Sequence, residues 1–296
     1  MGAIVVLFSA LLFASATVGV KFATMNGEAS AIHVTMARFL AGLLFMLPTV
    51  IRDPSILKPQ VPRWVWLRAV SNVVAVVLFF FGVQLTTVSK ANLLNMTYPV
   101  FVFLFAPTVT GEKNSPVLTA LLALTLVGVW NVVRPENLHA FRDIAVGDVL
   151  AFGSAIIAGF AIAALRRTRR HDRSATIVFY IMAVGVAANA GLLFLVPSPD
   201  SAVMFTIIAA GTAGALGQML LTVGFRHVSA AAGALLSTAR IPIAGAMGII
   251  LFADRITPRT IVGAVLILVS LTGVTLYNPL VSALRRRASI PSRGTR

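Results

Sequence analysis

The chain has 296 residues, of which 58% are hydrophobic and 11% charged, with a mean hydropathy of +0.94. A globular protein of this composition would not stay dissolved in water, so we expect the chain to lie in a lipid bilayer. A bilayer core about 30 Å thick needs roughly 20 apolar residues per spanning helix. The length therefore holds about ten spans and excludes a separate soluble enzyme domain.

The charge is strongly positive, at +15, from 24 Lys and Arg against 9 Asp and Glu. In a soluble chain this excess would suggest nucleic-acid binding. Here five cations lie in 166–173 and five in 285–296, as expected for loops and a tail at a membrane surface. We therefore expect lipid and a small-molecule substrate as partners, no nucleic acid, and a fold that a monomer can complete. The chain has no Cys, and we expect neither a metal nor a cofactor.

Ten apolar runs of spanning length are each ended by charge, Pro or Asn, which predicts an all-α integral membrane protein. We expect the first five helices near 4–22, 32–51, 65–85, 91–109 and 117–133. The second five are expected near 146–165, 176–196, 203–225, 230–252 and 261–280.

Loop charges predict the orientation of these helices. With the amino terminus inside, fifteen cations fall on the cytoplasmic side and six outside, with three more inside helices. Cytoplasmic loops carry the excess of Lys and Arg, so both termini should be cytoplasmic, in a bacterial inner membrane. The predicted units are a first five-helix repeat over 1–138, a second over 139–284, and a basic tail over 285–296.

The two halves of the sequence contain a weak internal repeat, in which similar residues recur in the same order. The segment 89–116, with Tyr98-Pro99 and Gly111-Glu112, is matched by 229–258, with Ile241-Pro242 and Asp254. Five helices are an odd number, so the second repeat must enter the membrane upside down relative to the first. Inverted repeats of this kind usually place a substrate between the two halves.

Arg38-Phe39-Leu40-Ala41, the segment from Ser89 to Glu112, and 263–267 together resemble the EamA family of the drug/metabolite transporter superfamily. The resemblance covers the whole chain, and the arrangement looks most like the YddG-type exporters of aromatic and other amino acids. It implies a central cavity surrounded by helices one, three, four, six, eight and nine. It also implies export from the cytoplasm by alternating access.

Arg240 is the main candidate site residue, because a lone cation near the middle of a span costs at least about 2.5 to 3.5 kcal/mol. Its planar guanidinium suits a substrate carboxylate, although a structural pairing with another helix is the alternative. Pro99 and Pro242 should kink the fourth and ninth helices and free the carbonyls of Asn95 and Thr238. The remaining candidates are polar or aromatic residues inside the predicted bundle: Asn92, Met96, Tyr98, Ser237 and Gln218.

Arg38 lies seven residues into its predicted helix, where an inward role and a side chain that reaches the interface are equally expected. All nine acids fall in loops or at helix ends, so no acid at mid-membrane is predicted to carry protons. We therefore expect export that does not require proton coupling. The alternatives are export of another small organic metabolite or drug and, less favoured, an intramembrane enzyme or a subunit that transports nothing.

Overall fold

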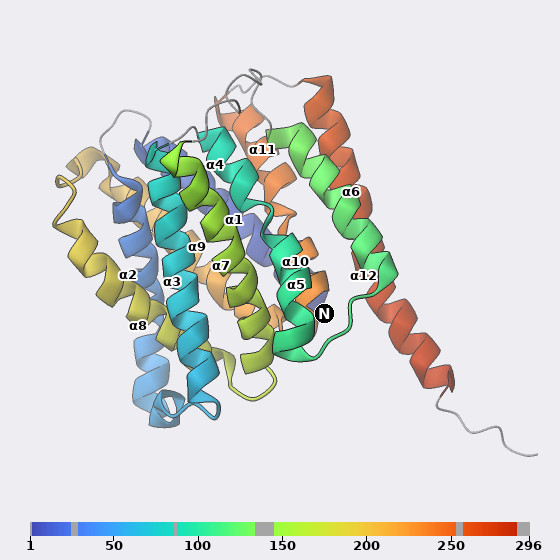
Figure 1. The fold of residues 1–296 in the computed structure, drawn as a ribbon. Helices are drawn as coiled ribbons and strands as arrows, with labels where there is room; N and C mark the ends of the chain where they lie inside the picture. The colour runs from blue at the N-terminus through green and yellow to red at the C-terminus, as the bar shows by residue number, and fades with distance from the viewer. Residues whose placement is uncertain (1, 25–28, 86–87, 134–144, 253–256, 289–296) are drawn as a thin grey trace, which may run out of the picture.

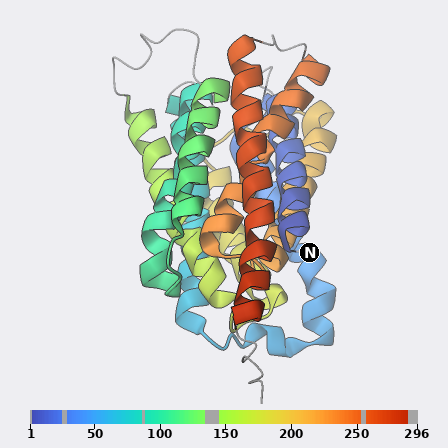
Figure 2. The ribbon, with the colours of Figure 1, turned by 90° about the vertical axis from the view of Figure 1, so that its right-hand side faces the viewer.

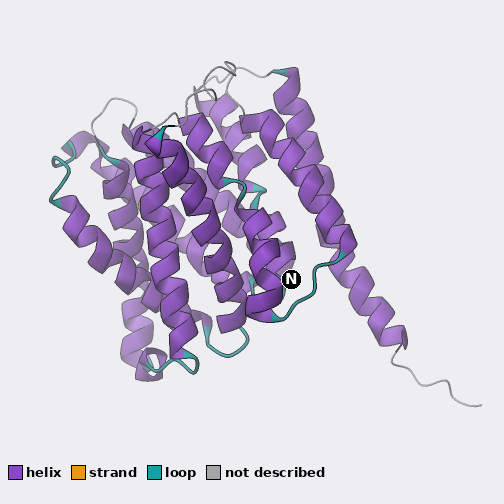
Figure 3. Cartoon of the chain, viewed as in Figure 1, coloured by secondary structure: helices purple, strands orange, loops and turns teal. Residues whose placement is uncertain are grey.

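The computed structural model describes residues 2–24, 29–85, 88–133, 145–252 and 257–288. Within these ranges the chain is helical with no strand, and the described part of the chain confirms the predicted fold class (Figures 1 and 3). The first repeat contains α1 (Gly2–Thr24), α2 (Ala31–Arg52), α3 (Pro62–Leu85), α4 (Val88–Asn95), α5 (Tyr98–Thr110) and α6 (Pro116–Val133). The second contains α7 (Val146–Thr168), α8 (Ser174–Leu193), α9 (Met204–Gly224), α10 (Ala230–Ser237), α11 (Arg240–Phe252) and α12 (Pro258–Ala288).

The ten predicted spans match these helices in order. In the described residues, nine helical segments are long and apolar enough to cross a bilayer when the fourth and ninth spans are counted across a break. The tenth, α6, has 18 residues and a length of about 27 Å at 1.5 Å per residue, close to the thickness of the hydrocarbon core.

The fourth and ninth spans differ from the continuous kinked helices that the sequence predicts. The fourth is divided into α4, which ends at Asn95, and α5, which begins at Tyr98; the ninth is divided at the same place between α10 and α11. Each proline lies in the first turn after the break, where the missing amide removes no helical hydrogen bond. The chain therefore stops one helix and starts another instead of bending a continuous one (Figure 3).

The packing of the helices follows the two repeats. Helix α3 lies along α7, and the corresponding pair, α9 and α1, packs in the same way. Two further pairs join equivalent helices, α2 with α8 and α6 with α12. The second pair lies at one edge of the bundle in Figure 1 and faces the viewer in Figure 2. At the α6–α12 contact a Cβ on Gly128 would lie 2.9 Å from the carbonyl oxygen of Gly263, so two glycines let the helices meet.

One end of the bundle carries the loops 53–61, 111–115, 169–173 and 225–229, and we call it the N-terminal face because α1 begins there. Gly111, with a φ of 70°, ends α5 at this face in the left-handed conformation that favours glycine. Ser229 caps α10 there by accepting a hydrogen bond from the amide of Ala232. These two helix ends position the charged groups described below.

Candidate functional site

The breaks in the fourth and ninth spans lie against each other, because α5 packs on α10. Tyr98, the first residue of α5, is buried, and its hydroxyl donates to the carbonyl of Ala234 at 3.1 Å. The same hydroxyl is hydrogen-bonded to Ser237, the last residue of α10. One aromatic side chain therefore connects the broken spans of the two repeats.

Arg240 begins α11 directly after the second break. Its guanidinium carbon lies 5.5 Å from the centre of the Tyr98 ring, within the range of a cation–π contact. Its Nη2 reaches the sulfur of Met96 at 3.3 Å, in the break of the other repeat. The structure thus brings four predicted site residues together: Met96, Tyr98, Ser237 and Arg240.

Arg38 points into the bundle. Its Nη2 donates to Oε1 of Gln218 on α9 at 2.9 Å, and its guanidinium carbon lies 5.2 Å from the ring centre of Phe13 on α1. Gly214 makes room for this side chain, since a Cβ there would lie 2.9 Å from Cδ of Arg38. Of the two roles expected for Arg38, the geometry matches the inward one.

Other predicted residues lie outside this group. Nδ2 of Asn95 donates to Ser154 on α7 at 2.8 Å, and the hydroxyl of Thr238 donates to the carbonyl of Leu235 within its own segment. The carbonyl of Thr238, expected to be free, accepts the amide of Ile241 at 2.9 Å. That part of the prediction is wrong, because the tight turn at the break supplies a donor three residues on. Asn92 is half-buried on α4.

Arg68 on α3 has no predicted role, yet it is among the most deeply buried residues, with 1% of its surface exposed. Within the described part of the chain, its Nε and Nη2 and the Nε of Arg38 are buried without hydrogen-bond partners. The guanidinium groups of Arg38 and Arg240, and those of Arg38 and Arg68, are close enough for their like charges to repel each other. We call Arg38, Arg68 and Arg240 the central arginine cluster.

Acidic side chains lie elsewhere. The described ones are at helix ends and in loops, outside the apolar spans or at their first turns: Asp53, Glu112, Asp148, Asp172 and Asp200.

Arg68 resembles an interfacial anchor in sequence, because it is only six residues from the start of α3. Its burial depends on neighbouring helices, and no local pattern predicts it.

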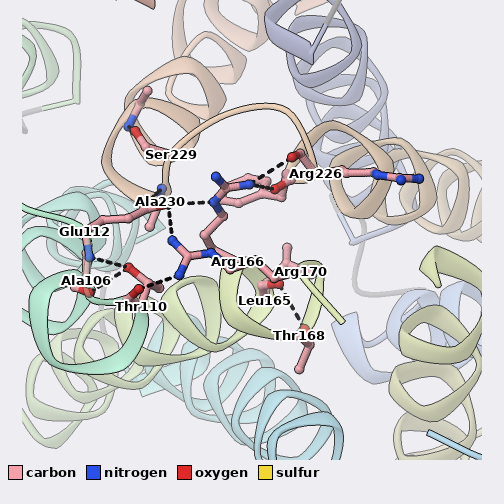
Figure 4. Close-up of polar contacts among 12 residues, drawn as sticks. Ala106, Thr110, Glu112, Leu165, Arg166, Thr168, Arg170, Arg226, Ser229 and Ala230 are labelled. Atoms are coloured by element: carbon pink, nitrogen blue, oxygen red, sulfur yellow. Dashed lines mark hydrogen bonds and ion pairs between the residues drawn. The ribbon is translucent and has the colours of Figure 1, made fainter. Parts of the chain in front are cut away.

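A second set of charges closes the N-terminal face (Figure 4). Glu112 accepts from Nε of Arg166 at 2.8 Å, from Nη2 of Arg170 at 2.7 Å and from the amide of Ala230 at 2.9 Å. We call these residues the Glu112 network. It connects the end of α5 in the first repeat to the end of α7 and the start of α10 in the second.

The arginines of this network also bind carbonyl groups. Nη1 of Arg166 donates to the carbonyls of Phe225 and Arg226, both at 2.9 Å, and Nη1 of Arg170 donates to that of Thr110 at 2.6 Å. Burial alone would raise the pKa of Glu112, but the Ala230 amide and the two arginines outweigh burial and hold that pKa below its usual value. Glu112 is therefore ionised at neutral pH.

The two ends of the bundle are packed differently. Helices α5 and α10 meet at the N-terminal face, whereas their repeat-related partners, α4 and α11, share no comparable contact in the described residues. A polar pocket of about 400 Å³ at this face, next to Arg169, Asp172 and Arg226, holds none of the predicted site residues. The fourth and ninth spans are thus in contact through the halves that lie next to the N-terminal face.

Comparison with known proteins gives matches along most of the chain. The EamA-like transporter family model matches residues 1–134 and again 145–276, one match in each repeat. The pseudopaline exporter CntI of Pseudomonas aeruginosa is 28% identical over 207 residues, which cover 69% of this chain and 72% of that protein. Solute carrier family 35 member G1 of Mus musculus is 25% identical and covers 93% of this chain, which in turn covers 78% of it.

The fold also has a counterpart among solved structures. One crystal structure superposes on this chain with a TM-score of 0.76 and 18% sequence identity. The aligned residues cover 94% of this chain and 98% of the other. At that identity the match concerns the architecture of the bundle alone.

Proposed function

We propose that this chain, which belongs to the EamA-like transporter family, exports a small organic metabolite that carries a carboxylate, through a site at the breaks of its fourth and ninth spans. The observation that carries the proposal is Arg240. It lies at mid-span between the repeats, with the sulfur of Met96 and the ring of Tyr98 as its described contacts and no described acid bound to it. A half-buried guanidinium without a described protein carboxylate suits the carboxylate of a ligand.

The N-terminal face would be cytoplasmic, and the count of fifteen cations against six supports that orientation. In alternating access the two repeats would rock about the site at the breaks, with Pro99 and Pro242 in the first turns beyond the moving joints. The Glu112 network would close the cytoplasmic side and release when that side opens.

Amino acids, including aromatic ones, are the substrates that we propose first, because Tyr98 offers an aromatic surface next to the cation that would bind the carboxylate. The pseudopaline exporter supports export of a metabolite, and another small organic molecule or a drug is the alternative. An intramembrane enzyme is less favoured, because no predicted span holds a pair of His, Asp or Glu residues that could serve as base and acid.

We further propose that transport follows the substrate gradient without obligatory proton coupling. The acids within the described residues lie in loops or at helix ends, and the sequence predicts the same positions for the others, so we expect no acid at mid-membrane to carry a proton. Accumulation driven by a pH difference alone, and collapsed by a protonophore, would contradict this.

The test is flux of an amino acid and of its carboxamide analogue into proteoliposomes, with the wild type and with Arg240→Ala. We expect the wild type to transport the carboxylate faster than the carboxamide, and Arg240→Ala to lose that preference. The flux of the carboxylate should fall at least about 100-fold in Arg240→Ala, which corresponds to the loss of roughly 2.7 kcal/mol of hydrogen bonding to a charged group. Arg240→Lys should recover part of it, since a point charge does not reproduce a bidentate contact. Equal loss for both substrates would contradict carboxylate recognition.

A further inference from the structure

The central arginine cluster holds more positive charge than one carboxylate can neutralise. We propose that the transported molecule carries at least two anionic groups, carboxylate or phosphate, and that Arg38 and Arg68 bind the groups that Arg240 does not. This inference rests on the proposed function, because it assigns the substrate class of the same site. It narrows the amino acids proposed above to those with a second anionic group, which the aromatic amino acids lack.

The first step of the argument is the absence of an internal partner for Arg68. Nε and Nη2 of its guanidinium are buried without hydrogen-bond partners within the described part of the chain, and the side chain is almost completely enclosed. A buried charge left in this condition destabilises the protein. An ionisable side chain of this kind inside a membrane span therefore points to a ligand that pairs with it. A guanidinium with two open donors fits the two oxygens of a carboxylate or phosphate group.

Arg38 is also only partly satisfied. The partner of its Nη2 is the neutral amide oxygen of Gln218, and its Nε has no partner in the described chain. The rings of Phe13 and Phe39, at 5.2 and 5.7 Å, attract the cation but bring no negative charge. Arg38 therefore has an open donor and no anionic partner in the described chain.

The three cations are also spread along the direction of transport. Arg68 is six residues from the start of α3, about 9 Å from the N-terminal face, and Arg38 is seven residues from the start of α2, about 10 Å from the opposite face. Arg240 begins α11 between these depths, at the break. A molecule with two anionic groups can contact two of these arginines at once, whereas a molecule with one carboxylate leaves two unpaired.

The experiment measures flux in proteoliposomes for two pairs of molecules that differ by one anionic group: glutamate with glutamine, and phosphoserine with serine. The first pair tests a second carboxylate and the second pair tests a phosphate. Each flux is measured for the wild type, Arg68→Met, Arg68→Lys and Arg38→Met. Arg52→Gln removes an exposed arginine at the end of α2 and is the matched control.

We expect the wild type and Arg52→Gln to favour the molecule with the second anionic group in at least one pair, by about tenfold, which corresponds to about 1.4 kcal/mol. Arg68→Met and Arg38→Met should each bring that flux ratio toward one. Arg68→Lys keeps the positive charge and should retain part of the preference, so it serves as the test if Arg68→Met does not fold. Equal flux within both wild-type pairs, or ratios unchanged in the variants, overturns this inference and leaves the proposed export intact. Flux of an aromatic amino acid without flux of any of the four molecules would overturn this inference alone, and no flux of any of the five would contradict both proposals.

Discussion

The Glu112 network and the central arginine cluster contain the same kind of side chain in opposite conditions. At the N-terminal face, Arg166 and Arg170 share a carboxylate and also donate to backbone carbonyls. In the centre, Arg38 and Arg68 have buried donors with no partner in the described chain. Arginines that hold the protein together are paired within it, and we infer that those in the centre are reserved for the cargo.

The largest effect on stability is expected from a substitution in the Glu112 network, where the arginines are paired within the protein. Glu112→Gln keeps the size of the side chain but removes the charge that two arginines share, so we expect a loss of about 2 kcal/mol in the free energy of unfolding. Thermal unfolding in detergent measures the loss. Asp200→Gln, in an exposed loop whose carboxylate binds only neighbouring groups, is the control and should change little.

The same network gives the pH dependence a definite sign. The pKa of Glu112 is lower in the folded protein than its usual value, so its contribution is complete above about pH 4.5 and is lost as the pH falls through the folded value. The difference in unfolding temperature between the wild type and Glu112→Gln should therefore narrow on acidification from pH 7 to below pH 4. A difference that grows over that range would contradict the assigned role.

A smaller effect is expected at Gly214, where a Cβ would press on Cδ of Arg38 from 2.9 Å. Because this atom belongs to a flexible side chain, Gly214→Ala should move Arg38 and weaken anion transport several-fold while costing about 1 kcal/mol or less in stability. Gly153→Ala on α7, where a Cβ meets nothing within 4 Å, is the matched control. Equal transport by the two variants would remove the support for a positioned Arg38.

The helices could be predicted from the sequence because an apolar run of spanning length is a local feature, and the ten runs match the described helices in order. The breaks could not be placed, since a proline within an apolar run is equally consistent with a kink and with the first turn of a new helix. Arg240 could be singled out by its depth alone. Arg68 could not, because its burial is decided by helices that pack against α3.

The Glu112 network illustrates the same limit over a longer distance. Glu112, Arg166 and Ala230 come from three helix ends that meet only when the repeats pack together. One signal was available in the charges of the loops, which predict the orientation of the helices. The predicted orientation then places 112, 166 and 230 at one face of the membrane, although it does not show which of them touch.

The most direct test of the central comparison is the thermal unfolding of two arginine variants in detergent without substrate. Arg167→Met removes a bond to the carbonyl of Val109 at 2.6 Å and a contact 4.5 Å from the ring centre of Trp64, so the unfolding temperature should fall. Arg68→Met removes a buried charge that has open donors, so the unfolding temperature should rise. A fall in Arg68→Met as large as that in Arg167→Met would show that Arg68 is paired within the protein and would contradict a cluster reserved for an anionic cargo.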